Sequence, residues 1–156
     1  MLKKSLQLCA EIESMIGQIY RNFEQSSAST PKMKAFWAQM ALDETDHERQ
    51  IRFVLRLPTK EICLNKEGEE DRRVATLHGQ VRAALTRVEQ EMLTANKMLD
   101  LAEQLESHFM TVHAANAVAS QHKSLKTMLT ALGKHDQEHI AQLTEFIKDF
   151  RSTQPS

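Results

Sequence analysis

The ten residues "ALDETDHERQ" (41–50) place a carboxylate and an imidazole, Glu44 and His47, three residues apart. Both fall in a helical row, at steps of three and four, that is apolar before and after them. A charge on an inward face costs free energy unless it is paired or holds a metal. The stretch is therefore either exposed, or part of a core that needs these two groups. The full row reads Trp37, Met40, Glu44, His47, Ile51 and Val54.

The composition around this stretch favours helices. The chain has 156 residues, only 4 glycines and 3 prolines, and many residues of high helix propensity. The charges are nearly balanced, with 20 basic and 21 acidic residues, so the composition does not predict a surface that binds nucleic acid or an anionic membrane. There is no apolar run long enough for a membrane span or a secretory signal, and the two cysteines form no CxxC pair. We therefore expect a soluble, cytoplasmic, all-α protein with one domain over residues 1–151 and a disordered tail at 152–156.

Hydrophobic periodicity predicts the helices on either side of the quoted stretch. Inward rows give a first helix over about residues 3–25 and a second over about residues 31–57. Thr30 and Pro31 are typical of a helix start, as cap and first residue. Because the break between the two helices is short, we expect them to pack as antiparallel neighbours. A last helix is expected over about residues 120–150.

The middle of the chain leaves two interpretations open. Residues 65–71, "NKEGEED", form the clearest linker, and a row of apolar residues resumes at Val74. That row is either one helix over about 72–117 or a short helix followed by a long one near 86–117. If residues 58–86 travel the length of a bundle, the fold is a four-helix bundle with a long crossover between helices 2 and 3. One continuous helix would overshoot a compact monomer and need a domain-swapped partner; a homodimer is our default expectation.

Acidic residues interrupt the inward row of every predicted bundle helix. Each row is apolar, then acidic near its middle, then apolar again, and folding the bundle would bring these interruptions to one level. Two of the helices add a histidine three residues after the carboxylate, which puts both side chains on one helix face. The candidate ligands are Glu13, Glu44, His47, Glu103, Glu106, Asp136 and His139.

The negative charge of these candidate ligands indicates what must be bound among them. Four or five carboxylates in a core of low dielectric constant repel one another and would not all ionise. Two cations would neutralise them, because carboxylates are hard oxygen donors that can bridge two metals. One imidazole per metal, added to these oxygens, suits iron or manganese better than copper or a structural zinc. Carboxylates on two helices and a carboxylate-x-x-His on each of the other two form the pattern of di-metal bundles.

These residues resemble the rubrerythrin branch of the ferritin-like superfamily. The likeness covers nearly the whole chain and rests on Glu13 with Tyr20 seven residues later, then "DETDH", "AEQLE" (102–106) and "HDQEH". It implies a ferritin-like bundle with a non-haem di-iron centre held by the candidate ligands. It also implies that Tyr20 donates a hydrogen bond beside the metals, and that Asp43 and His135 orient the ligand imidazoles.

The chain departs from this family in three places. It has no paired CxxC motifs of a rubredoxin domain, so an electron donor would be external. Asp136 stands where the family usually has a glutamate, and its side chain is one methylene shorter. Tyr20 is the only tyrosine, so the helix 3 tyrosine common in the family is missing. The resemblance therefore implies the fold and the metal more directly than the reaction.

Three functions fit this sequence. The first is an oxidoreductase in which two iron ions deliver electrons to H₂O₂ or O₂. The second is iron binding, as a ferroxidase or in storage or delivery. The third is a structural or interaction protein with a degenerate site, whose 8 methionines would serve dimerisation. We rank them in that order, with manganese as the alternative metal and enzyme activity left undecided.

Overall fold

The computed structural model describes residues 2–56, 69–119 and 123–153, which form helices and the turns that join them. The predicted all-α class is confirmed. Within these ranges no helix has the length and apolar character that crossing a membrane requires. The helices are α1 (Leu2–Gln25), α2 (Pro31–Leu55), α4 (Glu69–Gln90), α5 (Ala95–Ala119) and α6 (Lys123–Ser152).

The start of α2 forms as its sequence predicts. Thr30 has an extended backbone, and its side-chain oxygen accepts a hydrogen bond from the backbone N–H of Met33 at 3.2 Å. Pro31 follows at the first helical position, where its missing N–H leaves no donor unsatisfied. This cap fixes the helical phase that turns Glu44 and His47 toward the interior.

The two interpretations of the middle of the chain are resolved by a break at residues 91–94. Met92, which periodicity placed on the inward row, is 79% exposed in this break. Thr94 accepts a hydrogen bond from the backbone N–H of Lys97 and begins α5. The alternative of one continuous helix over 72–117 is therefore wrong. The argument for a domain-swapped partner depended on that helix and no longer applies. The shorter alternative also placed the break too early, because α4 itself has 22 residues.

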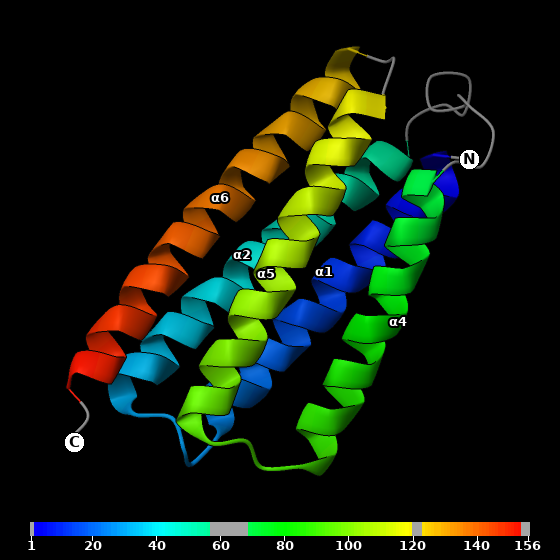
Figure 1. Ribbon diagram of the computed structural model, residues 1–156. Coiled ribbons are helices and arrows are strands. Elements are labelled where there is room, and N and C mark those ends of the chain that lie inside the picture. The colour runs from blue at the N-terminus through cyan, green and yellow to red at the C-terminus, as the bar shows by residue number, and fades with distance from the viewer. Residues whose placement is uncertain (1, 57–68, 120–122, 154–156) are drawn as a thin grey trace.

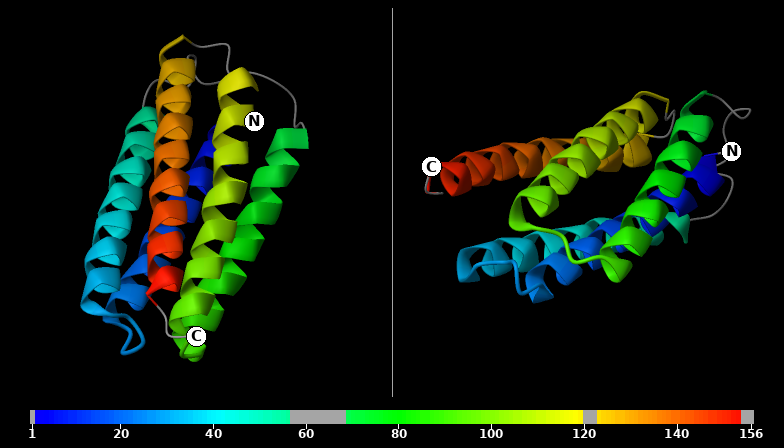
Figure 2. Two further views of the ribbon diagram at one scale, coloured as in Figure 1. Left: turned by 60° about the vertical axis from the view of Figure 1, so that its left-hand side comes forward. Right: turned by 60° about the horizontal axis from the view of Figure 1, so that its bottom comes forward.

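Successive helices run in opposite directions along the bundle (Figures 1 and 2). α2 and α5 therefore run parallel, and α4 begins within the segment assigned to a crossover, 58–86, and extends beyond it. α1 packs along α2 and α4, and α5 packs along α6. By contrast, α2 and α6 meet over a much shorter stretch. α2 and α6 therefore lie close together over only part of their length.

Parts of the sequence interpretation fall outside the described residues. Cys63, residues 65–68 of the predicted linker and the last residues, 154–156, lie there. The end of α6 is described, and it reaches Ser152, so the first residue of the predicted disordered tail is helical.

Candidate metal centre

Four helices each turn a carboxylate into the interior at the middle of the bundle. Glu13 comes from α1, Glu44 from α2, Glu106 from α5 and Asp136 from α6, and none of these residues is more than 2% exposed. His47 and His139 are 2% and 4% exposed. Helical phase explains this placement, because each residue sits in a row of buried apolar side chains and cannot leave it without rotating the helix.

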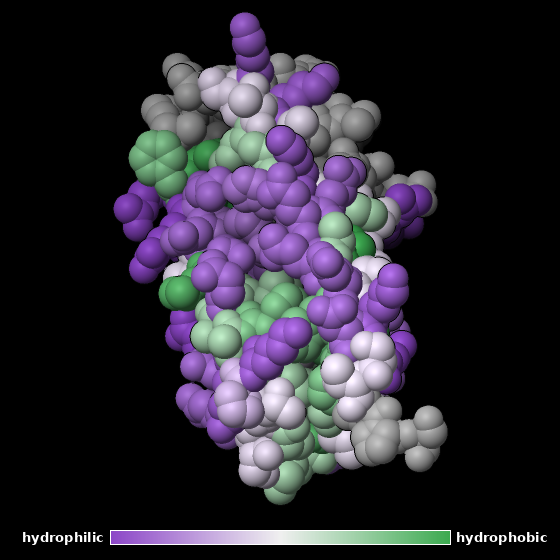
Figure 3. Space-filling view, turned by 90° about the vertical axis from the view of Figure 1, so that its left-hand side faces the viewer, coloured by the Kyte–Doolittle hydropathy of each residue, from purple (hydrophilic) through white to green (hydrophobic). Residues whose placement is uncertain are grey.

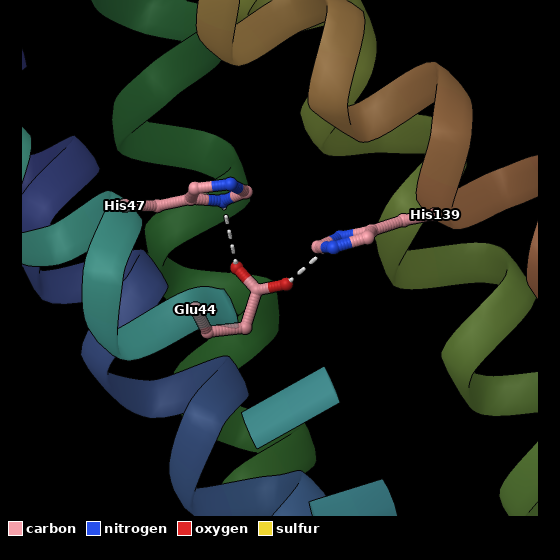
Figure 4. A group of neighbouring side chains, drawn as sticks. All are labelled: Glu44, His47 and His139. Atoms are coloured by element: carbon pink, nitrogen blue, oxygen red, sulfur yellow. Dashed lines mark ion pairs between the residues drawn. The ribbon is translucent and has the colours of Figure 1, made fainter. Parts of the chain in front are cut away.

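Glu44 lies between the two imidazoles, as Figure 4 shows. Its Oε2 atom is 3.5 Å from Nδ1 of His47, and its Oε1 atom is 3.3 Å from Nδ1 of His139. One ligand atom from each of the three residues lies within 4.8 Å of the others, a spacing suited to a metal ion. Each oxygen of the Glu44 carboxylate thus has an imidazole nitrogen beside it, and a carboxylate can bind a metal ion through either oxygen.

The other carboxylates divide between the two imidazoles. Oε2 of Glu13 is 3.8 Å from Nδ1 of His47, and Oε2 of Glu106 is 3.8 Å from Nδ1 of His139. Asp136 is close enough to act electrostatically on both Glu13 and His47. The side chains therefore form two groups that share Glu44, with Glu13 and His47 on one side and Glu106 and His139 on the other.

The pKa values of the buried groups show that ionising all the carboxylates together is unfavourable. Burial, together with the neighbouring carboxylate Glu44, raises the pKa of Glu13 well above its ordinary value. Burial also raises the pKa of Glu106, and Glu44 adds to that shift. Burial opposes protonation of His139, but Glu106 and Glu44 outweigh it and raise its pKa to about 11. Without metal, protons bound to the histidines and to the carboxyl groups offset the negative charge of the cluster.

The hydrogen-bonding residues around the cluster lie close to where the sequence places them. Asp43 Oδ2 accepts a hydrogen bond from Nε2 of His139 at 3.2 Å, which leaves Nδ1 of His139 facing Glu44. The hydroxyl of Tyr20 donates to Oε1 of Glu106 at 2.5 Å. The contact that the structure shows for His135 is ring stacking on His47, with centroids 5.5 Å apart. Such partners fix the tautomer and orientation of a ligand imidazole or carboxylate.

One predicted ligand does not reach the cluster. Glu103 is exposed on the outer side of α5, one turn before the buried Glu106. The inward row of α5 runs instead through Ala102, Glu106 and Phe109. The predicted row fails at this step, because Leu99 and Glu106 are buried as expected but the row between them passes through Ala102. The prediction of an inward carboxylate at position 103 is therefore wrong.

Two features of the surroundings have no clear signal in the sequence. Tyr20 stacks on Trp37 with centroids 5.5 Å apart, and this pair closes the interior on one side of the cluster. On the outer side, a cleft of about 240 Å³ between α2 and α6 has His47 and His139 in its wall. Both features depend on how separate helices meet, which one row of residues does not report.

The donor set fits metal ions. Oε1 of Glu44 and Nδ1 of both histidines are buried and make no hydrogen bond within the described part of the chain. Buried polar atoms are normally satisfied, so such atoms gathered at one point indicate a missing partner. No lysine or arginine is buried among the residues whose burial is described, so within the protein only the two imidazoles can carry positive charge beside the four carboxylates. Two divalent ions would balance them when both imidazoles are neutral.

Comparisons with known proteins add no family to this geometry. No family model matches the chain, and neither the curated proteins nor the solved structures include a match.

Proposed function

We propose that the chain is a non-haem di-iron carboxylate protein of the ferritin-like, rubrerythrin type that acts as an oxidoreductase on H₂O₂ or O₂. The observation that supports it best is the position of Glu44, whose two oxygens face His47 and His139 at 3.5 and 3.3 Å. The parallel course of α2 and α5, with α4 between them in the chain, agrees with a ferritin-like bundle.

Each side chain has a role in this proposal. Glu44 would be shared by the two ions, Glu13 and His47 would hold the first, and Glu106 and His139 would hold the second. Asp136, buried beside them, supplies a further oxygen. The donors are mostly carboxylate oxygens, which favour iron or manganese. When bound, two ferrous ions would supply the two electrons that reduce a peroxide to water.

The protein surrounds this chemistry with groups that hold ligands and exclude water. Tyr20, which is fully buried, donates its hydroxyl proton to the hydrogen bond with Glu106 and restrains that carboxylate. Asp43 restrains the imidazole of His139 from the cleft side. Trp37 stacks on the ring of Tyr20 and packs against Phe23, so water is excluded from that side of the site. A reductant from outside the chain would have to return the electrons.

Anaerobic loading with Fe(II) followed by peroxide tests the proposal. We expect two ferrous ions to bind per chain, and the ultraviolet absorption of ferric iron to appear when H₂O₂ is added. One peroxide should be consumed for every two ferrous ions, because each ion loses one electron.

Two variants sharpen the experiment. Glu44→Ala removes the shared carboxylate and should abolish the rapid reaction, whereas Glu103→Ala, on the exposed side of α5, should react as the wild type does. Bound Fe(II) that is not oxidised by peroxide or by O₂ would contradict the redox function while leaving metal binding in place.

A further inference from the structure

The cleft between α2 and α6 opens beside the proposed metal centre. Four of its lining residues come from α2 and four from α6, and its volume is about 240 Å³. Figure 3 views the side of the molecule where α2 and α6 lie, and hydrophilic side chains gather in a broad band across it. The lining residues are Asp43, Asp46, His47, Gln50, His135, Glu138, His139 and Gln142.

Only two residues of the metal centre reach this cleft. His47 and His139 form its inner wall, with ring centroids 5.3 Å apart, and the buried carboxylates lie behind them. Nδ1 of His47 is buried and without a hydrogen bond among the described residues. An ion in the cleft would therefore meet the two imidazoles before it met Glu44.

Buried apolar side chains flank the cluster along α2 and α6. On α2 the cluster is flanked by the buried side chains of Met40 and Ile51, and on α6 by those of Leu132 and Leu143. On the α1 side, a Cβ atom added to Gly17 would lie 3.5 Å from Cβ of Glu44, so α1 and α2 are in close contact beside Glu44. A hydrated ion cannot cross such packing without losing its water.

The charge and size of the cleft suit a hydrated cation. Asp43, Asp46 and Glu138 line it, and among the described residues the guanidinium bonded to them is that of Arg49, 3.1 Å from Asp46. A cleft lined by one sign of charge concentrates ions of the opposite sign. An ion with six waters occupies roughly 180 Å³ if each water takes about 30 Å³, which is less than the volume of the cleft.

We infer that the α2–α6 cleft is the entry port through which hydrated divalent cations reach the centre, with Glu138 steering them and the His47–His139 pair receiving them. This inference rests on the proposed metal centre and adds the route to it. It predicts that residues of the cleft rim change the rate of metal uptake without changing the number of ions bound.

Stopped-flow uptake of Co(II) tests the port, because Co(II) bound to nitrogen and oxygen ligands has its own visible absorption. Trp37 is the only tryptophan and stacks on Tyr20, so its fluorescence gives a second readout for the wild type and for the variants that add no tryptophan. Glu138→Gln should slow uptake about threefold at an ionic strength of about 0.01 M, and the effect should disappear near 1 M salt. Gln142→Trp should slow uptake about tenfold or more at both ionic strengths, because the helices must part before an ion passes.

Matched variants on α6 serve as controls. Glu145→Gln removes a carboxylate two turns beyond Glu138, and Gln137→Trp adds a bulky ring at an exposed position; neither residue lines the cleft. Both should take up Co(II) at the wild-type rate. If Glu138→Gln and Gln142→Trp also do so, with the same final stoichiometry, the port is wrong and the metal centre stands. If the wild type binds neither Co(II) nor Fe(II), the proposed metal centre is wrong, and the port is wrong with it.

Discussion

Oε1 of Glu44 on α2 lies 3.3 Å from Nδ1 of His139 on α6, two helices that come close together at few residues. Both residues are at most 4% exposed. Apolar packing alone does not explain two buried polar groups at this point, because burying them costs free energy unless they gain a partner. In the proposed metal centre, a cation between them, shared through Glu44 with His47, would be that partner.

Glu44→Ala tests this relationship at its centre. We expect the variant to lose both metal ions, because Glu44 is the residue that faces both imidazoles. The metal-free variant should stay folded, since removing one of several crowded carboxylates relieves repulsion. Elemental analysis gives the metal content and circular dichroism the helicity, with Glu103→Ala as the control. Two tightly bound ions in Glu44→Ala would refute the bridging role.

Metal binding should release protons at pH 7. The pKa of His139 in the metal-free chain is about 11, so its imidazole is protonated at this pH and must lose a proton to bind a metal through Nδ1. Raised pKa values of Glu13 and His47 add to the release. Titration calorimetry in buffers of different ionisation enthalpy measures the number of protons. Binding without release of at least one proton would mean that His139 is not a ligand.

The stability of the metal-free chain should fall as the pH rises. His139 titrates near 6.5 when unfolded and near 11 when folded, so its contribution is complete below pH 6.5 and is lost as the pH approaches 11. One such group changes the free energy of unfolding by at most about 1.4 kcal/mol per pH unit. Urea unfolding between pH 6.5 and 9 measures this slope, and His139→Asn should flatten it. An equal slope in wild type and variant would assign the effect to other groups.

Tyr20→Phe should weaken the hold on Glu106. The hydroxyl donates to Oε1 of Glu106 at 2.5 Å in a fully buried position, so its removal leaves a buried acceptor without that donor. We expect the free energy of unfolding of the metal-free protein to fall by about 1–3 kcal/mol. Metal should still bind, because Tyr20 is not itself a ligand. Loss of all metal from Tyr20→Phe would show that the tyrosine does more than restrain Glu106.

Asp43→Asn should change the metal bound beside His139 more than the one beside His47. Asp43 accepts the hydrogen bond from Nε2 of His139 and has no such contact with His47 among the described residues. Loss of a carboxylate partner of this kind typically lowers metal affinity about 10- to 100-fold. Competition with a chelator should therefore remove one ion at lower chelator concentration than the other. Asp46→Asn, on the same helix, is the control, and equal removal of both ions from Asp43→Asn would contradict the division of the site.

Helical periodicity was enough to predict most of the site. Glu13, Glu44, Asp136 and His139 each interrupt a long apolar row, and the cost of burying charge makes such an interruption informative. Glu103 and Glu106 are three residues apart, so both fit a wide inward stripe, and only the true start of α5 decides between them. The break at 91–94 gave a weak signal because Met92 is apolar and in phase, although it is exposed.

The contacts between helices were beyond the reach of the sequence. The bond between Asp43 and His139 joins residues 96 positions apart, and it depends on how α2 and α6 meet. The cleft beside it also depends on how these two helices meet, because both of them contribute residues to its lining. A row of residues fixes which face of a helix turns inward, but it does not fix which neighbour that face meets.

The most direct test is a measurement of metal identity and number in the isolated protein, by elemental analysis together with anomalous scattering from crystals. We predict two ions of iron, or of manganese, per chain, one on each side of Glu44 and next to His47 and His139. Protein that binds no metal when supplied with Fe(II), or that holds a single ion away from Glu44, would contradict the di-metal centre and leave only the helical architecture.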